Sequence, residues 1–181
     1  MDYPYDQPSD YIKHFWTTYK SQNNRNPNLN GKRFEYILAS LCIREGILPL
    51  YLSAKVAFVP NVIYDLMFYT SESGPICWSV KTSLRERYKQ ADLESIALKY
   101  VHRKAKSYLI TLSEEALGVK EKIANGDVIG LDNAVIATTP EFDKLINDLK
   151  ALKLGKPPKV EVITSTQVVT TEEVKLSFPN K

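Results

Sequence analysis

Cysteine is scarce in this sequence, and long apolar runs are absent from it. Cys42 and Cys77 are the only cysteines, and both lie among apolar neighbours. A disulfide framework needs more cysteines, so we expect two buried thiols in a reducing compartment. No apolar stretch approaches the ~20 residues that cross a bilayer, and the acidic, proline-containing start MDYPYDQPSD is unlike a signal peptide. These absences predict a cytoplasmic protein without a membrane segment.

Glycine-rich phosphate-binding loops are also missing. The chain contains neither G-x-G-x-x-G nor G-x-x-x-x-G-K-[ST], so the sequence makes no case for a nucleotide cofactor. Histidine is rare as well, and His14 and His102 do not form a metal-binding pair. Any metal chemistry must therefore rest on carboxylates.

Charge is nearly balanced over the chain but is unevenly placed. The formal net charge of +3 is too small to indicate a nucleic-acid partner. Between residues 81 and 106, eight Lys or Arg residues stand against three acidic ones, a net charge of +5 that leaves −2 elsewhere. A basic patch in one place fits a phosphate-facing surface, although charge alone favours a solvated helix face.

Apolar periodicity and turn residues divide the chain into helices and strands. Phe34, Leu38 and Cys42 recur at helical spacing before Gly46, which marks a helix end. Two β-rich runs flank the turn at 71–75 and predict a hairpin. The predicted helices span residues 9–19 with Ser9 as the cap, 31–46, 84–104, 114–124 and 140–152, and the predicted strands span 56–59, 61–69, 76–83, 107–113, 133–139 and 159–165.

This order of elements predicts an α/β (α+β) fold. We expect a mixed β-sheet with a central hairpin, flanked by helices, in which the helix at 84–104 turns inward its apolar residues Leu93, Ile96, Ala97, Tyr100 and Val101. At 181 residues, a single domain is the expectation. Its core covers about 31–139, with an N-terminal arm and helix at 1–20 and a C-terminal helix and strand at 140–181.

The predicted hairpin places an acid and a lysine close together. Asp65 interrupts an otherwise apolar strand, where an unpaired carboxylate is costly, so a function or an ion pair must explain it. Lys81 lies near the end of the other strand and shares a face with Ser79, two residues away. Phosphodiester hydrolysis uses a divalent metal held by carboxylates and a cation near the developing charge.

This constellation resembles the PD-(D/E)XK nuclease superfamily. There an Asp on one strand is followed by (D/E)-x-Lys on the next, and here the match is Asp65 followed by Ser79-Val80-Lys81. A serine thus stands where the second acid is expected. Some restriction endonucleases of the superfamily share this change and supply the carboxylate from the following helix, which implies Glu94 here, with Asp92 as the substitute. A glutamate on the preceding helix often joins the site, which implies Glu35.

The triplet Arg85-Glu86-Arg87 extends the resemblance. Type II restriction enzymes that read CC/GG-containing sites carry an Arg-(Asp/Glu)-Arg triplet shortly after the catalytic lysine. Arginine forks match guanine O6 and N7, and a carboxylate accepts from the cytosine amino group. The resemblance implies base recognition by this triplet, with Tyr88 and Lys89 on the DNA backbone. It also implies Mg²⁺ held by Asp65, Glu94 and Glu35, and a homodimer on a palindromic site.

Other interpretations remain open at this stage. A homing, repair or recombination nuclease of the same superfamily has no need of the triplet, and a catalytically inactive DNA-binding module accounts for Ser79. Individual residues also have plainer explanations. Glu94 is spaced to pair along its helix with Gln90 or Leu98, and Glu35 is spaced to pair with Lys32 or Arg33.

Overall fold

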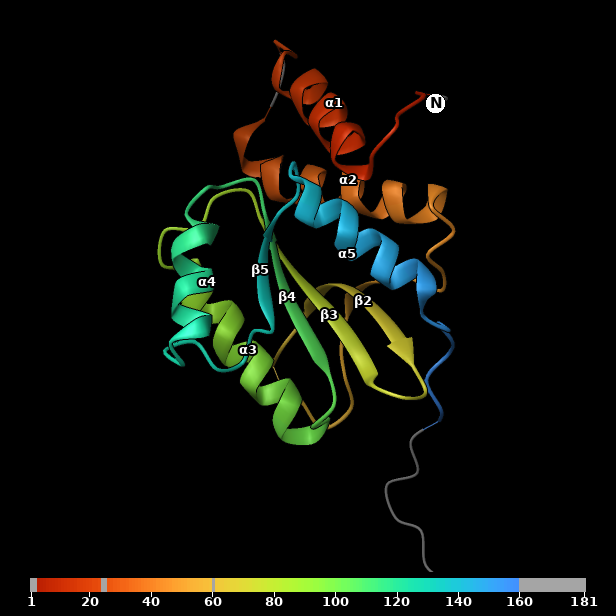
Figure 1. Ribbon diagram of the computed structural model, residues 1–181, viewed down its shortest axis with the longest axis vertical. Coiled ribbons are helices and arrows are strands. Elements are labelled where there is room, and N and C mark those ends of the chain that lie inside the picture. The colour runs from red at the N-terminus through yellow and green to blue at the C-terminus, as the bar shows by residue number, and fades with distance from the viewer. Residues whose placement is uncertain (1–2, 24–25, 60, 160–181) are drawn as a thin grey trace, which may run out of the picture.

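The computed structural model describes residues 3–23, 26–59 and 61–159, and Figure 1 shows helices on both sides of one β-sheet. The predicted mixed α/β fold with a central hairpin is confirmed. The elements are α1 (Pro8–Lys20), the short 3₁₀ helix η1 (Pro27–Leu29), α2 (Asn30–Arg44), β1 (Tyr51–Ala54), β2 (Tyr64–Thr70), β3 (Gly74–Lys81), α3 (Arg87–Val101), β4 (Lys106–Thr111), α4 (Ala116–Ala124), β5 (Asn133–Ile136) and α5 (Pro140–Ala151).

The five strands of the described chain lie in the sheet in their sequence order. β1, β2 and β3 are antiparallel neighbours, whereas β3, β4 and β5 are parallel. The parallel half requires crossovers, which α3 and α4 supply. The start of β2 therefore lies beside the C-terminal ends of β3 and β4, and Asp65 and Lys81 both lie at this end of the strands.

The sheet separates two layers of helices. On one face, β3 residues such as Trp78 and Val80 pack in a core with residues of α1, α2 and α5. On the other face, β4 and β5 pack against α3 and α4 through Leu109 and Ala134. Cys77 joins a smaller cluster on the α3 side, and both cysteine thiols are free and buried, as predicted.

The first helix begins differently from the sequence prediction. Gln7 is its N-cap residue, and Ser9 is the second residue of the helix, so Ser9 is not the cap. Instead, the backbone N–H and the hydroxyl of Ser9 donate to the buried carboxylate of Asp143 on α5, at 2.7 and 3.0 Å. One N-terminal donor of α1, the Ser9 amide, is thus satisfied by another helix, a tertiary contact that local spacing does not reveal.

The inward face predicted for α3 is wrong for three of its five residues, whereas Ile96 and Ala97 are partly buried. Leu93 and Tyr100 are 67% and 87% exposed, and Val101 is exposed as well. The buried side chains are Ala91, Ser95 and Leu98. Small residues let the helix axis approach the sheet closely, so the larger apolar side chains face outward.

Two predicted strands also change. Residues 56–59 form no strand, and the first strand of the described chain lies earlier, at β1. The strand predicted at 159–165 lies outside the described residues except for its first position. In a search confined to the described ranges, no helix has the length and hydropathy to cross a membrane.

Candidate active site at the end of the hairpin

The strand register brings Asp65, Ser79 and Lys81 to one face of the sheet. Leu66 pairs with Trp78, and extending that register by one residue sets Asp65 opposite Ser79. Lys81 lies two residues beyond Ser79, on the same face. This is the face of the sheet that α3 covers, so the three side chains lie on the α3 side, at the C-terminal end of β3.

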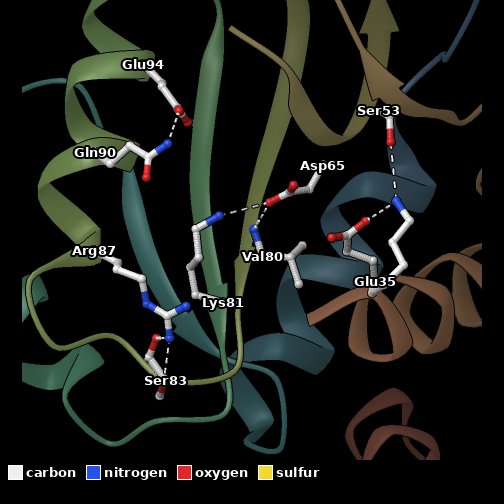
Figure 2. A network of polar contacts seen from close by, with 10 residues as sticks. Glu35, Ser53, Asp65, Val80, Lys81, Ser83, Arg87, Gln90 and Glu94 are labelled. Carbon is white, nitrogen blue, oxygen red and sulfur yellow. Dashed lines mark hydrogen bonds and ion pairs between the residues drawn. The ribbon is translucent and has the colours of Figure 1, made fainter. Parts of the chain in front are cut away.

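Asp65 and Lys81 form a direct, partly buried ion pair, as Figure 2 shows. The Nζ atom of Lys81 lies 3.2 Å from Oδ2 of Asp65, and the exposed fractions of the two side chains are 19% and 22%. The backbone N–H of Val80 donates to the same oxygen at 2.7 Å. Among the described residues, no hydrogen bond is made to Oδ1 of Asp65, so that oxygen is free for a ligand.

Ser79 occupies the position at which the superfamily pattern has an acid. Its Oγ atom is buried and has no hydrogen-bond partner among the described residues. A buried hydroxyl without a partner costs about 1–3 kcal/mol. The serine thus adds a polar atom beside Asp65 but no negative charge.

Glu35 lies on α2, on the far side of Asp65 from Lys81 in Figure 2. Its carboxylate is 2.6 Å from Nζ of Lys32, which also donates to Ser53 on β1. The hydrogen bond to Glu35 raises the pKa of Lys32, with a smaller contribution from the charge of Asp65. Glu35 therefore has the helix partner that its spacing allows, and that ion pair lies within the electrostatic reach of Asp65.

Glu94 is held along its own helix. Its Oε1 accepts from Nε2 of Gln90 at 2.7 Å, and Figure 2 shows the two side chains side by side on α3. Its backbone oxygen accepts from the hydroxyl of Tyr64, the residue before Asp65, at 3.0 Å. Among the described residues, no hydrogen bond or ion pair joins the Glu94 carboxylate to Asp65 or Lys81. A side-chain rotation away from Gln90 is needed before it joins them.

Asp92, the substitute for Glu94, has a structural role. Its Oδ1 accepts from the backbone N–H of Gly130 at 2.6 Å and of Leu131 at 3.3 Å. These bonds fasten the loop before β5 to α3. Both contacts of the Asp92 carboxylate are therefore with the loop before β5 and not with the hairpin.

The Arg85-Glu86-Arg87 triplet lies in the turn between β3 and α3. Arg85 has a positive φ of 44°, and Glu86, 82% exposed, is the N-cap residue of α3. The guanidinium of Arg87 donates to the backbone oxygen and the hydroxyl of Ser83, at 2.5 and 2.6 Å. Arg85 and Glu86 are thus presented to solvent, whereas Arg87 is folded against its own turn.

The residues after the triplet begin α3. The Lys89 side chain is 57% exposed, and its Nζ atom lies 3.0 Å from Oε1 of Glu86. The hydrogen bond to Glu86, and then the charge of that carboxylate, raise the pKa of Lys89. Tyr88 is half-buried against the cluster that α3 and α4 form with the sheet. Lys89 is therefore accessible to a phosphate, while Tyr88 contributes mainly to packing.

The residues present fit Mg²⁺ as a partial ligand set. In the described ranges, no three His, Cys, Asp or Glu side chains stand together in a way that could hold a metal ion. Mg²⁺ commonly binds one or two carboxylates, substrate phosphates and water rather than a complete protein cage. Asp65, through Oδ1, offers one such carboxylate oxygen, whereas the carboxylates of Glu35 and Glu94 are bonded to Lys32 and Gln90.

Comparison with protein-family models, curated proteins and solved structures finds no match for this chain. The geometry of the site is therefore the basis for any functional conclusion.

Sequence reasoning missed Glu115, which contacts the triplet's turn from another element. Its Oε2 accepts from the backbone N–H of Leu84 at 3.2 Å and of Arg85 at 2.7 Å. The bond from Arg85 is the main cause that lowers the pKa of Glu115. The order of the strands could have indicated this contact. Glu115 follows β4 and the triplet follows β3, and the C-terminal ends of two parallel neighbouring strands lie side by side.

Proposed function

We propose that this protein is a Mg²⁺-dependent endonuclease of the type II restriction class. It hydrolyses double-stranded DNA at a short palindromic site that contains CC/GG, and it acts as a homodimer. The observation that carries the proposal is the Asp65–Lys81 ion pair, set at the strand ends immediately before the Arg85-Glu86-Arg87 turn. One short segment thus joins a hydrolytic pair to base-reading side chains.

Asp65 and Lys81 have complementary parts in the reaction. Asp65 is the principal metal ligand, through the oxygen that makes no hydrogen bond within the described structure. Lys81 places a positive charge where an incoming phosphate group and water meet. Bound Mg²⁺ supplies charge stabilisation at the phosphate and activates water. The water oxygen then bonds to phosphorus as the bond to the leaving sugar oxygen breaks.

Glu94 and Glu35 complete the ligand set on either side. Glu94 leaves Gln90 to do so, and Glu35 leaves Lys32. Ser79 contributes its buried hydroxyl beside Asp65 without adding charge.

The proposed base contacts are made by the Arg85-Glu86-Arg87 triplet. The forked donors of Arg85 and Arg87 match the guanine acceptors, and Glu86 accepts from cytosine amino groups. Arg87 exchanges its bonds to Ser83 for base contacts when DNA is present. Each bidentate contact is worth ~1–3 kcal/mol of discrimination, and two-fold symmetry doubles the set. Lys89 and Tyr88 lie beside the triplet on the DNA backbone.

A second candidate is a DNA-binding module without catalysis. It is favoured by the pairing of Glu94 with Gln90 and of Glu35 with Lys32, together with Ser79 in place of an acid. A homing, repair or recombination nuclease is distinguished by Arg85→Ala. That substitution leaves the sequence preference of such an enzyme intact, whereas it relaxes the preference of a restriction enzyme.

The test separates catalysis from binding by means of Lys81→Ala. We expect cleavage in Mg²⁺ to fall by at least about 100-fold, a loss typical of removing one charge-stabilising group. Specific binding in Ca²⁺ should persist, because Lys81 is not part of the base-reading turn. Lys122→Ala, which removes an exposed lysine on α4, is the matched control and should cleave like the wild type. Equal loss of binding and cleavage in Lys81→Ala contradicts a catalytic role.

A further inference from the structure

The triplet's turn is held by a carboxylate from a different element. Glu115 is the N-cap residue of α4, 30 positions after Arg85 in sequence. Its Oε2 accepts from two successive backbone amides, those of Leu84 and Arg85. Leu84 is fully buried, whereas Arg85 is exposed, so the carboxylate fastens the point at which the chain leaves the core.

Sheet topology explains how Glu115 reaches this turn. β3 and β4 are parallel neighbours, and Lys81 pairs with Thr111 at their ends. The turns that follow the two strands therefore lie next to each other. Within the second turn, the Thr111 side chain accepts from the Ser113 amide at 3.1 Å, and the Ser113 hydroxyl accepts from the Glu115 amide at 3.3 Å. These two bonds order the segment that carries Glu115.

We propose that Glu115 is a positioning residue for DNA sequence recognition, fixing the backbone from which Arg85 and Glu86 reach the bases. This inference rests on the proposed function. Glu115 acts through the backbone, since its carboxylate accepts from amides and leaves the Arg85 guanidinium free to contact a base.

The conformation of Arg85 shows why such a support is needed. Its φ of 44° lies in the left-handed region, which non-glycine residues rarely occupy. Residues in such conformations are strained and persist when the surrounding contacts over-determine them. In this conformation the amide of Arg85 donates to Oε2 of Glu115. Losing the carboxylate therefore frees the turn to adopt ordinary backbone angles and misplaces both side chains.

The experiment compares Glu115→Ala with the wild type on defined DNA. A plasmid of known sequence first identifies the cleavage site, and duplexes carrying that site or single base-pair changes then measure discrimination as a ratio of kcat/KM. We expect Glu115→Ala to lower this ratio by about tenfold or more, the value of one bidentate base contact. KM for the cognate site should rise while kcat changes little, and Glu115→Gln, which keeps an acceptor oxygen, should recover part of the ratio.

Two controls separate positioning from general effects. Glu114→Ala removes an adjacent exposed carboxylate of equal charge whose side chain makes no hydrogen bond within the described ranges, and it should leave discrimination unchanged. A double-mutant cycle with Arg85→Ala tests the route of action, because Glu115→Ala should cause little further loss once the Arg85 side chain is gone. Faster amide exchange at Leu84 and Arg85 in Glu115→Ala should report the released turn.

The outcomes distinguish this inference from the function on which it rests. If the wild type cuts specifically and Glu115→Ala discriminates as well as Glu114→Ala, the positioning role is wrong and the proposed function stands. A full additional loss in the Arg85→Ala background also overturns it, because Glu115 then acts independently of Arg85. If the wild type cuts no DNA, the proposed function and this inference both fail.

Discussion

At the residue scale, the proposed chemistry depends on Asp65 and on which second carboxylate joins it. Asp65 is already paired with Lys81 across the hairpin. Glu94 and Asp92 compete for the second place, and their contacts differ. Within the described part of the chain, the Glu94 carboxylate is hydrogen-bonded only by Gln90 of its own helix, whereas Asp92 accepts from two backbone amides of the loop before β5.

These contacts predict opposite behaviour for two substitutions. Glu94→Ala should reduce Mg²⁺-dependent cleavage strongly and change the unfolding free energy little, because an exposed helix pair is worth only about 0.2–0.5 kcal/mol. Asp92→Ala should lower the unfolding free energy by about 1–3 kcal/mol, because it leaves the amides of Gly130 and Leu131 without their acceptor. Denaturant unfolding and cleavage assays on both variants measure the split. Full activity in Glu94→Ala rules out that residue as the displaced ligand.

The sequence correctly predicts that one pair of the candidate site residues lies close together. Asp65 and Lys81 meet as the hairpin pattern suggested, because period-two alternation and a short turn determine which strand residues share a face. The contacts of Glu94 and Arg87 depend on side-chain rotamers, which residue spacing does not specify. Glu115 was missed because its partner is separated by a whole crossover, so only the parallel pairing of β3 with β4 brings them together.

At the element scale, α3 connects the Arg85-Glu86-Arg87 turn to the rest of the fold. Its outer side was predicted to be buried because Leu93 and Tyr100 are large and apolar, whereas the face in contact with the sheet is lined by Ala91 and Ser95. Hydrophobicity patterns identify this segment as a helix but weigh large residues more heavily than small ones. The first strand escaped prediction for a related reason, since β1 lies at the edge of the sheet and is only partly covered.

Gly130 tests how closely α3 approaches its neighbouring loop. A side chain there would overlap the backbone oxygen of Asp92 and the backbone nitrogen of Ile96, neither of which moves without the helix. We expect Gly130→Ala to lower the unfolding free energy by about 1–3 kcal/mol, as overpacking does. For the proposed nuclease, cleavage specificity should fall too, because displacement of α3 also moves the turn before it, which holds the triplet.

Gly118 in α4 is the matched control for that substitution. Apart from the neighbouring backbone of its own helix, no atom lies within 4 Å of the position that its Cβ would take, and Gly118 stands in the first turn of α4. Gly118→Ala should therefore raise the unfolding free energy by roughly 0.5–1 kcal/mol through helix propensity. Thermal and denaturant unfolding measure both variants, and a Gly130→Ala protein as stable as the wild type contradicts the close packing described for α3.

At the scale of the whole molecule, positive charge is concentrated on one part of the chain. The segment from residue 81 to residue 106 carries a net charge of +5, while the remaining residues sum to −2. This segment contains the end of β3, the Arg85-Glu86-Arg87 turn and α3, so the positive charge lies on the elements that form the proposed DNA surface. Affinity for DNA should therefore fall steeply as the salt concentration rises, because bound phosphates release counterions.

Lys89 provides a quantitative test of that surface. If its ammonium contacts a phosphate, Lys89→Ala should weaken binding to all sequences alike and reduce the slope of log K against log salt by about 1. Lys122→Ala on α4 should leave the slope unchanged. Fluorescence anisotropy with labelled duplexes in Ca²⁺, over a series of salt concentrations, measures both. An unchanged slope in Lys89→Ala removes that lysine from the DNA surface.

The most direct measurement is digestion of a plasmid of known sequence by the purified protein in Mg²⁺, followed by sequencing of the new ends. A restriction endonuclease of the proposed kind gives ends at one short palindromic site containing CC/GG, and Lys81→Ala gives none under the same conditions. A wild-type protein that retards the plasmid in electrophoresis yet leaves it uncut in Mg²⁺ contradicts the endonuclease proposal and supports the DNA-binding module instead.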